Sequence, residues 1–241
     1  TEKIEDWLTS QNTTPDDLNW LLQIESSEAV SCTVSYGGSS FDFNIGEDKT
    51  ISSDAGSCLT RSPGNYWFEI SNSRSLGCLE NEYEVSCDKS FLTSLLFKKS
   101  DSDVVNVLEE VSSASSGGKT TEKIDSFCFI NGGECDYEGS LWAALALSSE
   151  KVDISSYLPY LVTLSEDNSR FLPSSFLYFL TGSVEFREEL FSRQRESKFW
   201  AESGNKFYDT ALALYPLRFE SFLQKENAVK YLLNEAQEED G

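Results

Sequence analysis

The sequence predicts an α+β protein, in which recurring helical hairpins carry an inserted antiparallel β domain that is braced by disulfides. Three observations predict this fold class. Apolar residues have helical spacing near the start of the chain and again from about residue 137 to the end. Between these stretches the apolar period changes to two, which indicates strands. All six cysteines lie inside the segment of period two.

The first of three expected domains is an N-terminal helical hairpin over residues 1–28, which packs with the helices at the other end of the chain. The spacing of Ile4 and Trp7 predicts its first helix. After a turn signal around Pro15, the leucines of residues 18–22 predict the second helix.

The second expected domain is β-rich and covers residues 29–136. Its clearest signal is a hairpin, because Cys32 to Tyr36 and Phe41 to Ile45 alternate around Gly37-Gly38. Further strands of an antiparallel sheet or small sandwich are expected at Tyr66 to Ile70, Tyr83 to Cys87, Phe91 to Phe97, Val104 to Leu108 and Ile124 to Ile130. Of these, the run from Phe91 also fits a helix. Serine-rich residues 112–118 predict a turn or linker.

The cysteines indicate the cellular compartment. They form an even set without a C-x-x-C pair, which favours three disulfides in an oxidising environment over a zinc site. They are Cys32, Cys58, Cys78, Cys87, Cys128 and Cys135. Six cysteines allow 15 pairings, and the sequence does not select one. The alternative is a set of buried free thiols in a reducing cytoplasm. Asn12-Thr13-Thr14 is a short glycosylation-type sequon.

The third expected domain, residues 137–241, is helical. Leu141 to Leu147 and Tyr208 to Leu214 share one pattern of apolar residues, which predicts an internal repeat. The other helices are expected at Ile154 to Leu164, Pro173 to Leu180, Val184 to Arg195, and around Val229, Leu232 and Leu233.

Gln194 to Trp200, followed by Tyr208 to Leu214, resembles the repeat unit of the terpenoid cyclase and protein prenyltransferase superfamily, whose helices end in Q-x-x-x-G-x-W. The resemblance covers residues 137–241 well and 1–25 loosely, and it leaves out the β-rich region. It implies an α/α toroid of stacked helical hairpins. In the family the Gln satisfies helix-end backbone groups and the Trp packs under the next helix. Lys198 replaces the Gly of the motif, so this turn must be built differently.

Gln237 to Gly241 resembles the first five positions of a further copy of this motif, cut before its Trp.

The residues that carry the family's chemistry are missing. The acid motif D-x-D-D-T-A would place its first Asp at Lys206 and its proton-donating Asp at Tyr208, and only Asp209 matches. A phenol with a reference pKa near ~10 is too weak an acid for that step. The chain has no His for the family's zinc site, and Gly133-Glu134-Cys135 lacks the order and the Gln of the thioester motif. The resemblance therefore implies a non-catalytic member.

The amino-acid composition argues against several classes of function. Asp and Glu number 41 against 19 Lys and Arg, which gives a net charge of -22 that repels nucleic acid and anionic membranes. The longest apolar run, Leu141 to Leu147, is too short to span a bilayer, which takes about 20 residues. The absence of Met and of a signal segment predicts a processed mature chain or an excised segment. We expect no cofactor and no metal.

Four aromatic residues are the candidate ligand-binding residues: Trp142, Trp200, Phe207 and Tyr208. Rings at helix starts in a repeat can line a pocket, although they more often belong to a core. Asp209 follows them and is interpreted as a residue that stabilises the first turn of its helix.

Acidic residues offer two weaker candidates. Glu134, Asp136 and Glu138 could bind a cation, but they lack a calcium-loop pattern and are interpreted as a solvated loop. A divergent cyclase or lyase would use Asp209 with Glu202 or Asp136 for acid–base chemistry.

The sequence therefore predicts a secreted or cell-surface module that is not an enzyme and that binds a protein or glycan partner. Two alternatives remain open. One is the divergent cyclase-like or lyase-like enzyme, and the other is a subunit of a surface layer or filament that self-associates through the ends of its repeats.

Overall fold

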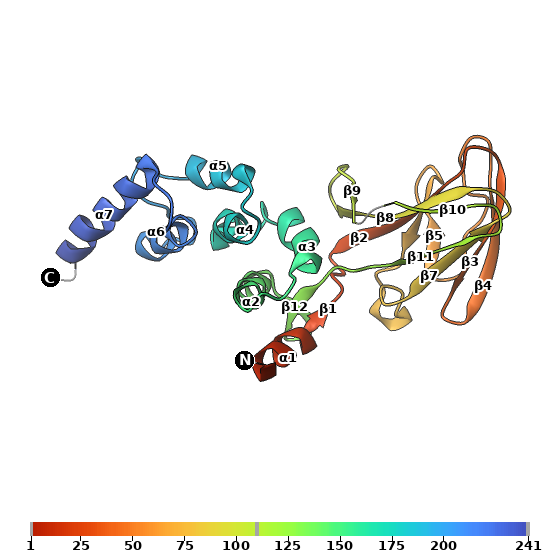
Figure 1. The fold of residues 1–241 in the computed structure, drawn as a ribbon, viewed down its shortest axis with the longest axis horizontal. Coiled ribbons are helices and arrows are strands. Elements are labelled where there is room, and N and C mark those ends of the chain that lie inside the picture. Colours follow the sequence, from red (N-terminus) through yellow and green to blue (C-terminus); the bar gives the residue numbers. More distant parts are fainter. Residues whose placement is uncertain (1, 109–110, 240–241) are drawn as a thin grey trace. The chain divides into compact units, whose positions relative to one another are not determined.

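The computed structural model describes residues 2–108 and 111–239 and divides the chain into two compact units (Figure 1). One unit, here called the β unit, is Thr13–Phe127. The other, here called the helical unit, combines Thr1–Asn12 with Cys128–Gly241. The chain is β-rich, with three sheets and short helices, and the expected α/α toroid of helical hairpins is wrong.

The β unit contains two sheets, and every strand pair in them is antiparallel. The first has the strand order β10-β8-β2-β6-β5, with β9 also paired to β8. Its strands are β2 (Leu18–Glu25), β5 (Leu59–Arg61), β6 (Trp67–Ile70), β8 (Phe91–Lys99), β9 (Asn106–Val107) and β10 (Ser112–Ala114). The second has the order β11-β7-β3-β4. Its strands are β3 (Val30–Tyr36), β4 (Ser39–Ile45), β7 (Glu82–Cys87) and β11 (Lys119–Lys123). A single turn of 3-10 helix, η1 (Arg74–Leu76), precedes β7.

The predicted second helix of the N-terminal hairpin is wrong, because residues 18–25 form the central strand β2. This strand pairs with β6 on one side and β8 on the other. Trp20 and Leu22 are buried with Leu21 between them, so both faces of the strand are covered. A strand that is buried on both faces has a nearly continuous apolar sequence, which periodicity alone cannot separate from a helix.

The predicted hairpin around Gly37-Gly38 is confirmed. β3 and β4 pair from Val30↔Ile45 to Tyr36↔Ser39, which leaves the two glycines as the loop. Their φ angles are 54° and 78°, the left-handed region that a two-residue hairpin turn requires and that glycine adopts without steric cost.

The other predicted strands differ in outcome. Those at Tyr66, Tyr83 and Phe91 are confirmed as β6, β7 and β8, and the helix alternative at Phe91 is wrong. The strand predicted from Val104 is reduced to the two residues of β9. The strand predicted over Ile124 to Ile130 is wrong in its first half, because β12 begins at Cys128. The run 112–118, predicted as a turn, begins with the short strand β10.

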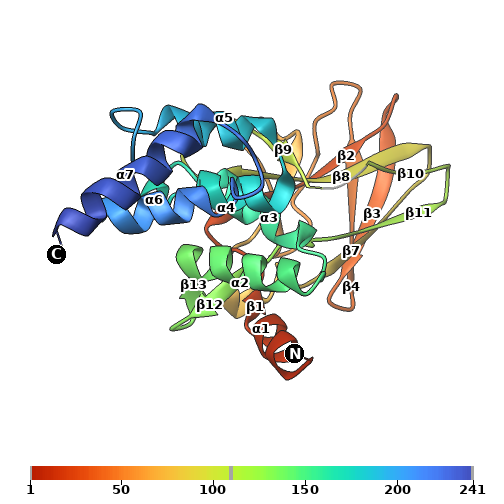
Figure 2. The same cartoon turned by 60° about the vertical axis from the view of Figure 1, so that its left-hand side comes forward.

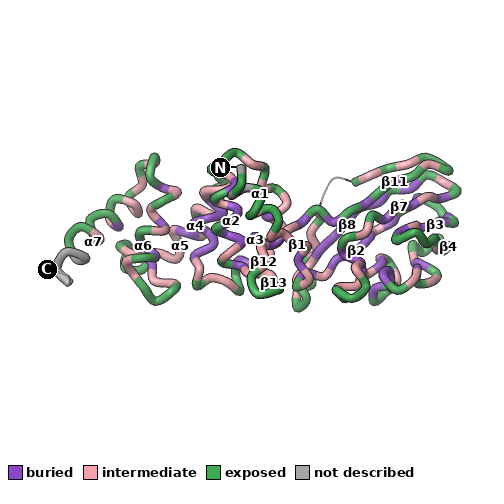
Figure 3. Tube along the Cα trace, turned by 90° about the horizontal axis from the view of Figure 1, so that it is seen from below, coloured by how far each residue is buried: buried purple, intermediate pink, exposed green. Residues whose placement is uncertain are grey.

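Buried side chains follow β2, β3, β7 and β8 in the β unit (Figure 3). Two disulfides add to this core. Cys32–Cys87 joins directly opposed residues of β3 and β7, and Cys58–Cys78 closes a second loop. Glu122 of β11 is also buried, and the Thr93 hydroxyl of β8 donates a hydrogen bond to its carboxylate, which links the two sheets.

The helical unit carries the remaining elements. Its helices are α1 (Glu2–Ser10), α2 (Tyr137–Ser149), α3 (Leu158–Thr163), α4 (Pro173–Thr181), α5 (Val184–Ser192), α6 (Lys206–Leu214) and α7 (Leu223–Glu239), with 3-10 turns η2 (Ser155–Tyr157) and η3 (Ser169–Phe171). A small sheet has the order β1-β12-β13, with strands β1 (Asn12–Thr13), β12 (Cys128–Asn131) and β13 (Glu134–Cys135). The Cys128–Cys135 disulfide closes the β12–β13 hairpin. In the described part of the chain, no helix combines the length and apolarity that a membrane span needs.

The predicted helices of this unit are confirmed as separate elements, but they do not repeat as toroid hairpins. The similarity of α2 and α6 has a local cause. Each begins behind a capping side chain, Asp136 for α2 and Asn205 for α6, and each continues with alanine and leucine. Such a pattern arises wherever a short helix is partly buried, so it does not require a shared repeat fold. Of the predicted partial copy at 237–241, residues 240 and 241 lie outside the described residues.

Candidate binding groove

Residues on and next to α2, α4 and α6 of the helical unit line an apolar groove of about 400 Å³. Figure 2 labels these three helices. Five aromatic side chains line it: Trp142 from α2, Phe176 and Phe179 from α4, Tyr208 from α6, and Tyr215 directly after α6. The remaining lining residues are small or aliphatic, and none is charged. The groove therefore presents ring surface from three helices to one space.

Helical spacing explains why these side chains converge. On α6 the lining residues Tyr208, Ala211, Leu212 and Tyr215 follow the i, i+3, i+4, i+7 pattern of one helix face. The Ser175 hydroxyl of α4 donates a 2.8 Å hydrogen bond to the Leu212 carbonyl, which fixes α6 against α4. This hydrogen bond therefore holds together two of the helices that line the groove.

The rings differ in how far they are covered. Phe176 is buried and forms the floor, with the Trp142 ring edge-on to it at a centroid distance of 4.8 Å. The rims are half exposed, at 42% for Trp142, 46% for Tyr208 and 47% for Tyr215. Because burial of apolar area is favourable, a ligand that covers these rims would gain binding free energy.

One end of the groove continues into a second hollow of about 260 Å³, which shares Trp142 and Tyr208 and adds Glu138 and Arg170. Burial, together with the negative charges of Glu138 and Asp209, raises the pKa of the Tyr208 phenol. Tyr208 therefore stays neutral at physiological pH and can donate a hydrogen bond there.

Arg218 lies against two rings of the groove, Phe179 and Tyr215. Its guanidinium carbon lies 4.4 Å from the Tyr215 ring centroid and 5.0 Å from that of Phe179. Neither Arg218 nor Arg170 forms an ion pair with a carboxylate of the described residues. In a chain with a net charge of -22, two arginines without an ion pair among the described residues and one acid thus lie beside the groove. The Arg218 guanidinium also donates a 2.8 Å hydrogen bond to the Tyr215 carbonyl.

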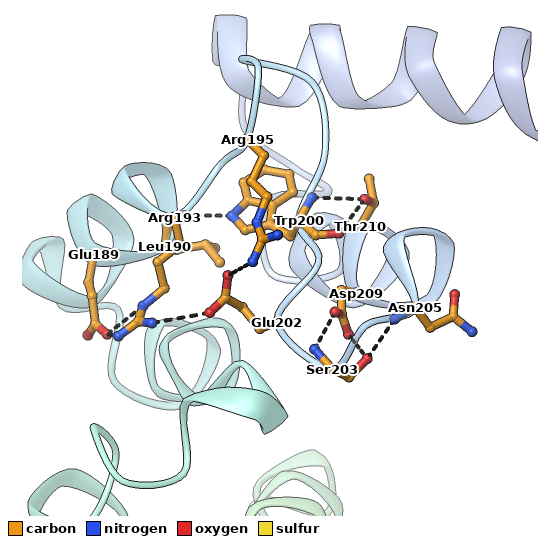
Figure 4. Close-up of polar contacts among 10 residues, drawn as sticks. All are labelled: Glu189, Leu190, Arg193, Arg195, Trp200, Glu202, Ser203, Asn205, Asp209 and Thr210. Carbon is orange, nitrogen blue, oxygen red and sulfur yellow. Dashed lines mark hydrogen bonds and ion pairs between the residues drawn. The ribbon is translucent and has the colours of Figure 1, made fainter.

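Of the four predicted ligand-binding residues, the structure places Trp142 and Tyr208 in the groove and the other two elsewhere. Trp200 is fully buried, and its indole N–H donates a 2.6 Å hydrogen bond to the Leu190 carbonyl (Figure 4). Phe207 packs on Tyr231 of α7 with a centroid distance of 6.0 Å. Both are packing residues of the helix junction.

Sequence reasoning missed Phe176, Phe179 and Tyr215, and the two bordering arginines. The signal was present for the rings: Tyr215 stands seven residues after Tyr208 on one helix face, and Phe179 stands three after Phe176. No sequence signal identified Arg170 or Arg218, because their position depends on how the helices pack.

The carboxylates of the enzyme alternative each have a structural partner, and Figure 4 shows the partners of Asp209 and Glu202. Asp209 is buried and accepts two 2.7 Å hydrogen bonds from the backbone N–H and hydroxyl of Ser203. Glu202 lies 3.4 Å from Arg193 and 3.5 Å from Arg195. Asp209 lines neither hollow of the groove.

Asp136 caps α2, where its carboxylate accepts hydrogen bonds from the Gly139 N–H and the Asn131 amide. These bonds, the Gly139 one first, hold its pKa below the ordinary value. The half-buried Asn12 of the sequon accepts a hydrogen bond from the Tyr157 hydroxyl.

Comparison of the chain with protein-family models, with curated proteins and with solved structures finds no match in any of the three. The expected membership of the cyclase and prenyltransferase superfamily is therefore wrong, because the described residues form no toroid of helical hairpins and no family model matches.

Proposed function

We propose that the chain is a secreted or cell-surface, non-catalytic interaction module that binds a partner in the groove between α2, α4 and α6. The observation that carries this proposal is the convergence of five aromatic rings on one apolar space, three of them half exposed. Proteins commonly bind their ligands in clefts of this size that have apolar and aromatic linings.

The composition of the groove favours a protein partner over a glycan. Aromatic residues and arginine are enriched at the centres of protein interfaces, whereas Asp and Glu are depleted. The groove follows this composition in a chain that is otherwise strongly acidic. A glycan needs many hydrogen-bond partners, and the Ser175 hydroxyl in the lining is already bonded to Leu212.

The cysteines support the proposed secreted or cell-surface location of the protein. All six are paired in three disulfides, two in the β unit and one in the helical unit. Such pairing is typical of proteins from oxidising compartments.

A test uses anilinonaphthalene sulfonate, whose fused rings match the groove and whose sulfonate matches its arginines. We expect one saturable site on the native protein. The double variant Trp142→Ala, Tyr208→Ala should weaken binding by about tenfold, which corresponds to about 1.4 kcal/mol. The matched control is Trp7→Ala, Tyr66→Ala, which removes two similarly exposed rings outside the groove. Equal weakening in the control, or no saturable binding, would refute the proposal.

A further inference from the structure

We infer that the groove binds helix α7 of a second copy of this chain, so that copies join head to tail. This inference rests on the proposed function, because it names the occupant of the same groove. Three observations support it. One face of α7 carries an exposed apolar stripe, charged residues lie on the same face, and the opposite face of α7 packs against its own unit.

The stripe consists of Leu223, Val229 and Leu233, here called the α7 stripe. Leu223 is 68% exposed and Leu233 is 59% exposed, so both side chains leave apolar surface open to a partner on one face of α7. At about 100° per residue, the three side chains lie within about 120° of one helix face. An amphipathic helix that lays such a face into an apolar groove is a common mode of protein recognition.

Two charged residues lie on the same face of α7. Glu226 and Lys230 are both exposed, and neither forms an ion pair with another described residue. The groove offers the complementary set, with arginines at its borders and Glu138 at one end. The apolar residues of the α7 stripe therefore match the apolar groove. Its acid and its base match the arginines and the glutamate beside the groove.

The contact has to be between copies, because α7 is held by its opposite face. Ala228 and Tyr231 are buried, and the Tyr231 ring stacks on Phe199 at a centroid distance of 5.0 Å and on Phe207 of α6 at 6.0 Å. While these contacts persist, the α7 stripe points away from its own α6. Each copy then keeps one open groove and one open stripe, which is the arrangement of a heterologous interface.

The first experiment is light scattering coupled to size-exclusion chromatography of the full chain over a concentration series. The expected result is a mass above the monomer's 27.0 kDa that rises with concentration. A constant monomer mass at the highest soluble concentration would overturn the inference. If anilinonaphthalene sulfonate still bound in the groove, the proposed function would stand and only its assignment to a second copy would fail.

The second experiment tests the head-to-tail geometry by mixing two variants. Leu223→Asp with Leu233→Asp removes the stripe, and Ala211→Glu places a charge in the groove. Each variant alone should be monomeric, whereas an equal mixture should form dimers that grow no further, because one intact stripe meets one intact groove. Val162→Asp, at an exposed apolar residue of α3 outside both surfaces, is the control and should assemble like the unmodified chain. Failure of the mixture to pair would exclude a head-to-tail contact.

Discussion

The β unit and the helical unit use their aromatic residues in opposite ways. Among the described residues of the β unit, Tyr66 is the single aromatic side chain with a largely exposed ring, because two sheets cover each other's apolar faces. The helical unit exposes Trp7, Trp142, Tyr208, Tyr215 and Phe219. Helices such as α2 and α6 leave one face exposed to solvent, so some of their rings remain on the surface. The difference shows that the rings of the β unit stabilise its core, whereas several rings of the helical unit remain accessible to the partner proposed above.

The two units are also held together differently. The β unit depends on strand ladders and on two disulfides. The helical unit depends on side chains that bond the backbone of a neighbouring helix end: Trp200 to Leu190, and the Gln194 amide to the Gln224 carbonyl at 2.9 Å. Covalent links should therefore matter most in the β unit, and single side chains most in the helical unit.

The largest effect should follow the loss of Cys32–Cys87. Replacing both residues by Ala frees a loop that spans 55 residues, which by chain entropy should cost about 4 kcal/mol. The same change at Cys128 and Cys135, which are seven residues apart, should cost about 2 kcal/mol. Urea unfolding measures both, and hydrogen exchange shows which unit opens. Equal costs would contradict the contrast between the units.

The next effect is expected for Trp200→Phe. The change leaves the buried Leu190 carbonyl without its donor and removes part of a fully buried ring, so we expect a loss of about 2 kcal/mol. Trp7→Phe is the control, because its ring is exposed and should change stability by less than about 0.5 kcal/mol. Urea unfolding of both variants makes the comparison. A Trp200→Phe protein as stable as its control would show that this bond does not hold the helical unit.

A smaller effect with a pH signature is expected for Asp136→Ala, which should cost about 1 kcal/mol as a lost N-cap. Hydrogen bonds, first from the Gly139 N–H, lower the pKa of this carboxyl in the folded state. Its contribution is therefore present above the unfolded value near ~3.9 and is lost as pH falls through the lower folded value. Unfolding curves at pH 6 and at pH 3 should differ less in the variant than in the unmodified chain. The same difference in both would refute this role of the cap.

The smallest effect on stability should come from Tyr208→Ala. The ring is half exposed, and Ala favours helix, so the free energy of unfolding should change by less than about 0.5 kcal/mol. Binding of anilinonaphthalene sulfonate should weaken nevertheless. A large loss of stability would show that the groove rings are core residues, and the contrast between the two units would fail.

Several features could be predicted from the sequence because they depend only on residues that are close together in the chain. The hairpin at Gly37-Gly38 was predictable because the turn needs left-handed residues between alternating strands. The helix α4 was predictable because Pro173 opens an apolar run that Gly182 ends. The oxidised state of the cysteines followed from their even number, and half of the predicted site, Trp142 and Tyr208, lies in the groove.

Tertiary structure alone decided the rest. Residues 18–25 could be helix or strand until β6 and β8 paired with them on both sides. Trp200 and Trp142 were both predicted to bind a ligand, yet one lies under a helix junction and the other on a groove rim. The exposure of a ring is set by the elements that pack around it, and those elements come from distant parts of the chain, so no local pattern could distinguish packing from binding.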